Sequence, residues 1–343
     1  MENKVRIYQD RSNCIVEAFP EYSELFSDVQ LKHSWLPKEI KVEKDKQNIL
    51  VDMTESQRHG VLTTLRLFTN YEVFAGEDWW NGRFKKILKG PEFTRMAAVF
   101  SMYELAVHKP FYQQLNEVLG LDTDDFYSSY VENPVLKARM DFIDEMINHP
   151  NDLVALGVFS MVEGAILYSA FGFLKSFQAN GNNDIKTINS GINYSLVDEG
   201  LHCTAAATCF NHLWKETTED ALFDSKYGDP FVVKTIIRQA AMRIFLHEEE
   251  LINMVFEKGP MPNAKKEELL AFVCARLNEC LINIGIEPIF DTTGDTVSEW
   301  FYKNITSFVM HDFFNTQGSQ YTNTWQEIDF DPRSYTDEEL EKD

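Results

Sequence analysis

The feature that most constrains this chain is a glutamate inside an apolar stretch. Glu163 stands in the middle of "FSMVEGAILYSAFGFL", whose length and composition predict a buried helix. An ionised carboxylate in apolar surroundings costs several kcal/mol unless a partner compensates for its lost hydration. The fold must therefore bring other charged groups to Glu163.

The rest of the chain shows mainly helical periodicity. For the first fifty residues the sequence predicts irregular chain with short helical pieces. From Thr54 onward, apolar residues recur at helical spacing. We expect helices over residues 54–76, 91–119, 152–180, 185–215, 230–258, 264–285 and 296–314, with one more after Pro134. Alternating strand patterns are scarce, so the sequence predicts one all-α domain of long helices.

Composition narrows the possible functions. The net charge of −22, from 54 acidic and 32 basic residues, argues against binding nucleic acid or an anionic membrane through a basic surface. The sequence has no run of about eighteen apolar residues, which predicts no membrane span. Five cysteines without a CxxC pair, and no signal peptide, predict a reducing cytoplasm.

Three further segments place acids in apolar frames. Glu72 lies in "LFTNYEVFAG", Glu104 and His108 lie in "FSMYELAVHKPFY", and Glu199 and His202 lie in "LVDEGLHC". Residues three or four apart share a helix face, so each Glu/His pair points two side chains the same way. Four carboxylates with one histidine per metal suit a pair of iron or manganese ions held inside a helical bundle. These residues and the metal ions would be the partners that the buried Glu163 requires.

Other interpretations of single residues compete with a metal site. One Glu-x-x-His spacing alone is more typical of a solvated helix face or a hydrogen-bonded core histidine. A denser acidic cluster, "HEEELI" at residues 247–252, lacks a second partner helix with an apolar frame. We therefore interpret that cluster as a mainly solvated face. A metal centre is favoured over these alternatives because six candidate ligands follow one another along successive helices: Glu72, Glu104, His108, Glu163, Glu199 and His202.

These segments resemble the small (radical-generating) subunit of class I ribonucleotide reductase. The resemblance rests on "SWLPKEI", "LFTNYE", "ELAVHKPFYQQLNEVLGL", "FSMVEGAILYSAFGFLKSFQ" and "GINYSLVDEGLH", and it covers roughly residues 30–315. It implies a ferritin-like helical homodimer whose dinuclear metal site reacts with an oxygen species and stores a one-electron oxidant. It also implies that the oxidant passes to a cysteine of the large subunit, which reduces ribonucleotides to deoxyribonucleotides.

The resemblance assigns roles residue by residue. The metal ligands that it implies are Glu72, Glu104, His108, Glu163, Glu199 and His202. Tyr112 falls on the tyrosine that carries the radical in many members, with a plain core tyrosine as the alternative. Trp35 and Asp198 match an internal electron-transfer chain. Their alternative roles are an ordinary packing tryptophan and a structural hydrogen-bond partner.

The chain ends in an acidic segment. Its last eighteen residues hold eight acids against two bases, so we expect a mobile tail over residues 316–343 after a domain at 1–315. The resemblance implies that this tail docks on the large subunit and that a tyrosine in it relays the electron. Tyr335 is best placed for that role, with Tyr321 second. The resemblance also implies a cytoplasmic enzyme with a flavodoxin-like activator as a further partner.

One departure from the family pattern concerns metal identity. Many members have aspartate where this chain has Glu72, and the longer glutamate occurs in subclasses that use manganese with iron or two manganese ions. Two transition-metal ions per chain, as Fe/Fe, Mn/Fe or Mn/Mn, therefore remain open. It also remains open whether the oxidant resides on Tyr112 or on the metals.

A second departure concerns helix geometry. Glu104 and His108 are separated by one residue more than in the usual Glu-x-x-His pair. Pro110 cannot donate a hydrogen bond to the carbonyl of Ala106, so the helix should be disturbed there. We expect a π-bulge that keeps Glu104 on the ligand face. A regular helix would instead put Leu105 at the ligand position.

Two other functions are alternatives to the reductase subunit. One is another ferritin-like di-metal oxidase, either ligand-binding or desaturase-like, which would bury a lipid channel. The other is a non-enzymatic metal store, which would need a shorter chain and a cage-forming surface. Trp35, Asp198 and the acidic tail favour the reductase subunit.

Overall fold

The computed structural model describes residues 4–68, 71–179 and 181–303. Within these ranges the regular elements are all helices, and there are no strands. The predicted all-α fold is confirmed. Short pieces occupy the first fifty residues, as expected, and they are α1 (Pro20–Tyr22), η1 (Ser23–Ser27), α2 (Asp28–Lys32), η2 (Pro37–Glu39), η3 (Val42–Asp45) and η4 (Asn48–Asp52).

The longer elements follow in chain order. They are α3 (Glu55–Leu67), α4 (Tyr71–Val73), η5 (Phe74–Phe84), α5 (Lys85–Ile87), α6 (Pro91–Tyr103), η6 (Glu104–His108), α7 (Lys109–Leu119), α8 (Asp124–Glu132), α9 (Pro134–Ile147), α10 (Asp152–Ala165), α11 (Tyr168–Ser176), α12 (Lys186–Glu219), η7 (Phe223–Tyr227), α13 (Pro230–Val255) and α14 (Lys266–Asn283). Residues 297–303 are also helical, and the rest of the helix expected over 296–314 lies outside the described residues.

Local sequence explains several helix boundaries. Thr54 and Gln57 form a capping box at the start of α3, each side chain accepting the other residue's backbone N–H. Prolines occupy the first turn of α6, α9 and α13, where a missing N–H costs nothing. Gly120 ends α7 with a φ of +72°, a left-handed conformation that glycine adopts without strain.

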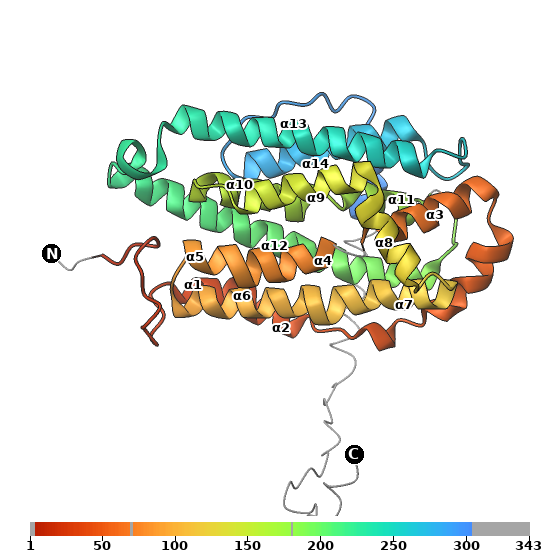
Figure 1. The fold of residues 1–343 in the computed structure, drawn as a ribbon, viewed down its shortest axis with the longest axis horizontal. Helices are drawn as coiled ribbons and strands as arrows, with labels where there is room; N and C mark the ends of the chain where they lie inside the picture. Colours follow the sequence, from red (N-terminus) through yellow and green to blue (C-terminus); the bar gives the residue numbers. More distant parts are fainter. Residues whose placement is uncertain (1–3, 69–70, 180, 304–343) are drawn as a thin grey trace, which may run out of the picture. The chain divides into compact units, whose positions relative to one another are not determined.

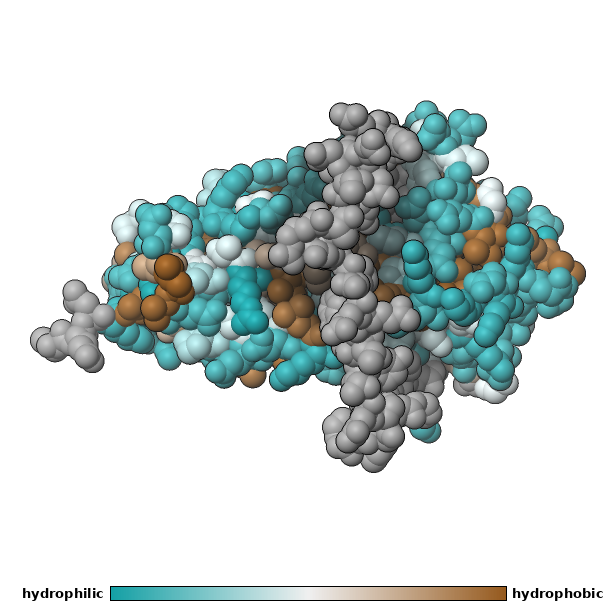
Figure 2. Space-filling model, turned by 90° about the horizontal axis from the view of Figure 1, so that it is seen from below, coloured by the Kyte–Doolittle hydropathy of each residue, from teal (hydrophilic) through white to brown (hydrophobic). Residues whose placement is uncertain are grey.

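The helix that carries Glu163 lies in the middle of the bundle. Figure 1 shows α10 between α13 and α14 on one side and α12 with α6 on the other. All residues of α10 from Leu153 to Ala165 are buried. The stretch Asp152–Ser176 is apolar and long enough to cross a membrane, but its most apolar 18-residue window is wholly buried inside the fold, as in the core helix of a soluble protein. The surface in Figure 2 is mostly hydrophilic, with hydrophobic residues in separate patches.

One expected helix is broken. We predicted a single helix over residues 152–180, whereas α10 ends at Ala165 and α11 begins at Tyr168. Two buried arginines explain the break. Arg276 donates to the carbonyl of Gly164 at 2.8 Å, and Arg139 donates to the carbonyl of Ile166 at 3.0 Å. Each arginine satisfies a carbonyl that the helix would otherwise use, which lets the chain turn.

Two further expectations need correction. The helix α8 was not predicted, although Thr123 caps it by accepting from the N–H of Phe126.

The "HEEELI" cluster was predicted to be a mainly solvated face, but Glu248 is fully buried. Its carboxylate lies 3.4 Å from a guanidinium nitrogen of Arg139 and accepts from the hydroxyl of Ser169. Burial raises the pKa of Glu248 to about 7, and the Arg139 charge opposes that rise.

Candidate metal centre

Four segments of the bundle converge on one buried cluster. Its six side chains are Glu72 from α4, Glu104 and His108 from η6, Glu163 from α10, and Glu199 and His202 from α12. No member is more than 1% exposed. The structure therefore brings together all six residues that the sequence singled out as candidate ligands.

The predicted helix disturbance is present. Residues Glu104–His108 form a π-helical turn, in which the Lys109 N–H bonds to the Glu104 carbonyl five residues back. The extra residue is absorbed there, and both Glu104 and His108 point into the cluster. A glycine permits the neighbouring segment to approach, because a Cβ on Gly76 would lie 2.7 Å from Cγ of Leu105.

The cluster divides into two overlapping groups, each able to hold a metal ion. One group contains Glu72 and His108, and the other contains Glu163 and His202. Glu104 and Glu199 belong to both. Within each group the ligand atoms lie within 4.8 Å of one another.

The two shared carboxylates each face both histidines. Glu104 places Oε2 at 3.0 Å from Nδ1 of His108 and Oε1 at 2.7 Å from Nδ1 of His202. Glu199 places Oε1 at 3.3 Å from Nδ1 of His108 and Oε2 at 3.8 Å from Nδ1 of His202. One oxygen toward each side is the arrangement of a carboxylate that bridges two cations.

Glu163 belongs to only one of the two groups, the one that contains His202. Its Oε2 is 3.9 Å from Nδ1 of His202, and its Oε1 accepts a hydrogen bond from Nε1 of Trp80 at 2.8 Å. Trp80 is fully buried and was missed in the sequence, where nothing separates it from any core tryptophan. This hydrogen bond fixes the orientation of the carboxylate and leaves the other oxygen directed at the cluster.

Burial and the neighbouring charges together shift the pKa values of the cluster residues. Desolvation raises the pKa of Glu72 well above its usual range, and the Glu104 charge adds to that rise. Desolvation likewise raises the pKa of Glu163, with the Glu199 charge adding to it. Burial alone would lower the pKa of His108, but the surrounding carboxylates, Glu104 first, raise it well above its usual value. Burial and like charge thus disfavour the ionised forms of Glu72 and Glu163.

The unsatisfied polar atoms fit a pair of cations. Both oxygens of Glu72, both oxygens of Glu199 and Oε2 of Glu163 are buried and make no hydrogen bond. Oε1 of Glu104 and Nδ1 of His202 lie 2.7 Å apart, yet neither atom makes a hydrogen bond. Buried polar atoms without partners are costly unless an ion binds them. Carboxylate oxygens with imidazole nitrogen suit iron and manganese.

A hydrogen-bonded chain leads away from the cluster. His108 Nε2 lies 3.0 Å from Oδ2 of Asp198, and Nε1 of Trp35 donates to the same oxygen at 2.9 Å. Gln30, which was missed in the sequence, donates to Oδ1 of Asp198 at 2.7 Å. Trp35 and Asp198 are both buried, so the structure joins these two predicted residues to the cluster.

Tyr112 lies one helical turn beyond His108. Its ring is buried and stacks on Phe68 at 4.2 Å between centroids with 5° between the planes. Burial raises the pKa of Tyr112 well above 10, and the Glu72 charge adds to that rise. The phenol is therefore neutral at physiological pH. The tail residues Tyr321 and Tyr335 lie outside the described residues.

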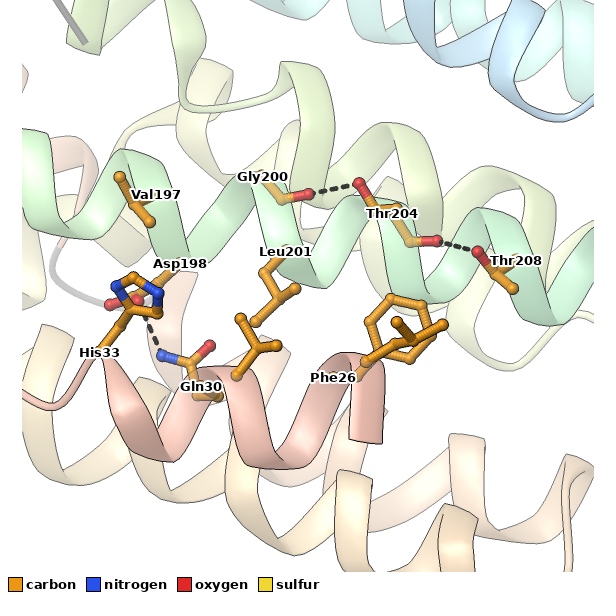
Figure 3. A pocket seen from close by; sticks show the side chains of 11 residues that line it. Phe26, Gln30, His33, Val197, Asp198, Gly200, Leu201, Thr204 and Thr208 are labelled. Carbon is orange, nitrogen blue, oxygen red and sulfur yellow. Dashed lines mark hydrogen bonds between the residues drawn. The ribbon is translucent and has the colours of Figure 1, made fainter. Parts of the chain in front are cut away.

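A cavity of about 490 Å³ opens between α2 and α12. Figure 3 shows Gln30 on α2 directed toward Asp198 on α12, with Phe26 and Leu201 further along the same cavity. The cavity adjoins the hydrogen-bonded chain, and none of the six cluster residues lines it.

Known proteins share this sequence pattern. The family model described as "Ribonucleotide reductase, small chain" matches residues 20–298. The chain is 25% identical over 261 residues to a probable ribonucleoside-diphosphate reductase small subunit 376L of Invertebrate iridescent virus 6, covering 70% of this chain and 69% of the relative. It is 23% identical over 309 residues to the ribonucleoside-diphosphate reductase subunit beta of Chlamydia pneumoniae, covering 84% of each.

Solved structures share the fold. A dimanganese(II)-NrdF of Streptococcus sanguinis has a TM-score of 0.70 at 18% identity, covering 84% of this chain and 96% of that one. A ribonucleotide reductase R2 subunit from Clostridium botulinum has a TM-score of 0.73 at 17% identity, covering 90% of this chain and 96% of that one. The resemblance that the motifs indicated is confirmed, since the family model covers most of the chain. The chain belongs to the ribonucleotide reductase small-chain family.

Proposed function

We propose that the cluster holds two transition-metal ions and that Glu104 and Glu199, which belong to both four-residue groups, would contribute to both ion sites. As the small subunit of a class I ribonucleotide reductase, the chain serves an oxidoreductase that works with a large subunit. Glu72 and His108 complete one ion site, and Glu163 and His202 complete the other. The observation that carries the proposal is the pair of overlapping four-residue groups with two shared carboxylates. When bound, the ions supply a one-electron oxidant.

Asp198 and Trp35 move that oxidising equivalent outward. Trp35 gives up an electron, and its Nε1 proton passes along the 2.9 Å hydrogen bond to Oδ2 of Asp198. Gln30 orients Asp198 by binding its other oxygen. Because all of these groups are buried, bulk water does not quench the oxidised tryptophan.

Tyr112 is the alternative to the metal ions as the group that stores the oxidant. Its ring lies in a shell of Phe68 and Phe111, which protects a phenoxyl radical from reaction with solvent. The phenol must lose its proton as it loses its electron. The Fe/Fe, Mn/Fe and Mn/Mn combinations are all compatible with the carboxylate and imidazole donors.

The assembly around this subunit follows the family. We propose a homodimer that binds the large subunit through the tail over 316–343, with Tyr335 as the relay within it. The eight acids in the last eighteen residues support docking on a basic surface of the large subunit. A flavodoxin-like activator and a cytoplasmic location complete the proposal.

Metal content and electron paramagnetic resonance test the centre itself. We expect about two ions per chain after reconstitution with iron, manganese or both. A tyrosyl signal that disappears in Tyr112→Phe would assign the oxidant to that residue. A metal signal that survives the substitution would assign it to the ions. Absence of any bound transition metal would refute the proposed centre.

Nucleotide reduction with the large subunit tests the transfer residues. Asp198→Asn keeps the shape but loses the proton acceptor, and we expect at least a tenfold loss of nucleotide reduction with metal content unchanged. Tyr103→Phe is the matched control, because Tyr103 is buried nearby and its hydroxyl lies 3.0 Å from the Gln30 carbonyl and 2.9 Å from the Ser34 hydroxyl. Full activity in Asp198→Asn would contradict the transfer role.

A further inference from the structure

A buried ion pair outside the metal cluster has no part in the function proposed above. Arg139 of α9 is 1% exposed and Glu248 of α13 is fully buried, and their charged atoms lie 3.4 Å apart. Ser169 of α11 donates its hydroxyl to the other oxygen of Glu248. A buried ion pair seldom stabilises a fold more than well-packed apolar residues of similar volume would. Stability alone therefore does not explain the presence of this pair.

Arg139 contacts two segments that carry candidate metal ligands. Its Nη2 donates to the carbonyl of Ile166 at 3.0 Å, three residues after Glu163. Its guanidinium also lies over the ring of Tyr71, 5.7 Å from the ring centroid, and Tyr71 directly precedes Glu72. One buried cation thus contacts both ligand segments, the one that carries Glu72 and the one that carries Glu163.

Tyr71 also joins the two ligand segments directly. It is buried, and its hydroxyl donates to the carbonyl of Val162 at 2.7 Å. Tyr71 and Val162 are the residues immediately before Glu72 and Glu163, so this hydrogen bond fixes the separation of the two backbones one residue away from each carboxylate. The guanidinium over the Tyr71 ring holds that ring in place for the bond.

The separation of the ligand segments matters because Glu72 and Glu163 each belong to only one of the two ion groups. Trp80 orients the carboxylate of Glu163 through a hydrogen bond. Within the part of the chain that the structure describes, neither oxygen of Glu72 makes a hydrogen bond. The backbone position of its segment therefore decides where the Glu72 carboxylate lies.

We propose that Arg139, held by Glu248, is a positioning residue for the metal centre. Through the Tyr71 ring and the Ile166 carbonyl it sets the separation of the two ligand segments. This inference rests on the proposed function, because it assumes that both segments supply metal ligands. Loss of the groups that orient metal ligands typically costs about 10- to 100-fold in metal affinity. We expect an effect of that size from the loss of Arg139.

A double substitution separates positioning from stability. Arg139→Met alone would leave the Glu248 carboxylate buried without its cation, which destabilises a fold. Arg139→Met combined with Glu248→Met replaces the pair by apolar side chains, and we expect this double variant to keep its helical fold. Tyr71→Phe is a milder variant, because it loses only the hydroxyl that bonds to Val162. Lys175→Met is the matched control, since Lys175 is a buried cation of α11 that donates to Asn193 of α12.

Metal binding and spectroscopy provide the readouts. Anaerobic titration with Mn²⁺ measures affinity, and electron paramagnetic resonance of the Mn²⁺-saturated protein reports the geometry of the ligands. In the double variant we expect about tenfold or greater weakening of Mn²⁺ binding and a changed spectrum. Tyr71→Phe should show a smaller change of the same kind, and Lys175→Met should show neither.

Wild-type affinity and spectrum in the folded double variant would overturn the positioning role. If the double variant does not fold, the same result in Tyr71→Phe would overturn it. An equal loss of affinity in Lys175→Met would also overturn it, because removal of any buried cation would then have this effect. If the wild-type chain binds no transition metal, the proposed function fails as well.

Discussion

Replacing Glu104 with glutamine tests whether one carboxylate serves two ions. Its oxygens lie 2.7 and 3.0 Å from the cluster nitrogens of His202 and His108, on opposite sides of the cluster. We therefore expect Glu104→Gln to weaken both ion sites. Glu163→Gln is the matched control, because Glu163 belongs only to the group with His202. That substitution should weaken one site alone.

The size of the effect follows from charge. Four carboxylates balance the charge of two divalent ions, and Glu104→Gln removes one of them from a site with no exposed ligand. A carboxylate shared by two divalent ions offers each ion about half a unit charge, which at 4 Å and an effective dielectric constant of about 20 corresponds to about 4 kcal/mol per ion. The amide oxygen still coordinates, so we expect roughly half of this, about 2 kcal/mol per ion. That corresponds to roughly 30-fold weaker affinity at each site.

Anaerobic titration with Mn²⁺, followed by calorimetry and by metal content after desalting, measures both affinities. Circular dichroism of each variant checks that the helical fold is retained. The reasoning would be refuted if Glu104→Gln lost only one ion, or if Glu163→Gln lost two. Either result would mean that the carboxylate shared between the histidines in the structure does not bridge the ions.

Two further predictions concern the fold. Gly164→Ala would bring a Cβ to 2.5 Å from Sγ of Cys203 and 2.6 Å from Sγ of Cys280, so we expect a loss of about 1–3 kcal/mol in the free energy of unfolding; an unchanged urea midpoint would contradict this. Burial lowers the pKa of Lys175 from 10.5 to about 8. Between these two pH values the unfolded chain binds more protons than the folded chain, so Lys175 should add up to about 3 kcal/mol to the stability as pH rises from 8 toward 10.5. Lys175→Met should lack this increase in pH-dependent unfolding, and an identical pH profile in both proteins would argue against it.

Much of the fold and the centre was predictable because the signals are local. Helical spacing of apolar residues depends only on the neighbouring sequence, so most helices were placed within a few residues. The π-helical turn at η6 was predictable for the same reason, since Pro110 and the extra residue lie within one turn of each other. The break after α10 was not predictable, because it depends on Arg139 and Arg276, which approach from other helices.

The burial of Glu248 is a second feature that depends on residues distant in the sequence. Its acidic neighbours suggested a solvated face, but one residue of that cluster points inward to Arg139 and Ser169. Neither partner is close to it in the sequence, so no local pattern identified the pair.

The sequence by itself determined which acids and histidines stand on the inward helix faces, since a face is a property of spacing within one helix. Only the tertiary structure decided that Glu104 lies between the two histidines, whereas Glu163 binds Trp80 and lies on one side. It also decided that Trp35 meets both Asp198 and Tyr194. The physical reason is that the rotation and offset of one helix against another come from side-chain packing between distant segments, which periodicity does not encode.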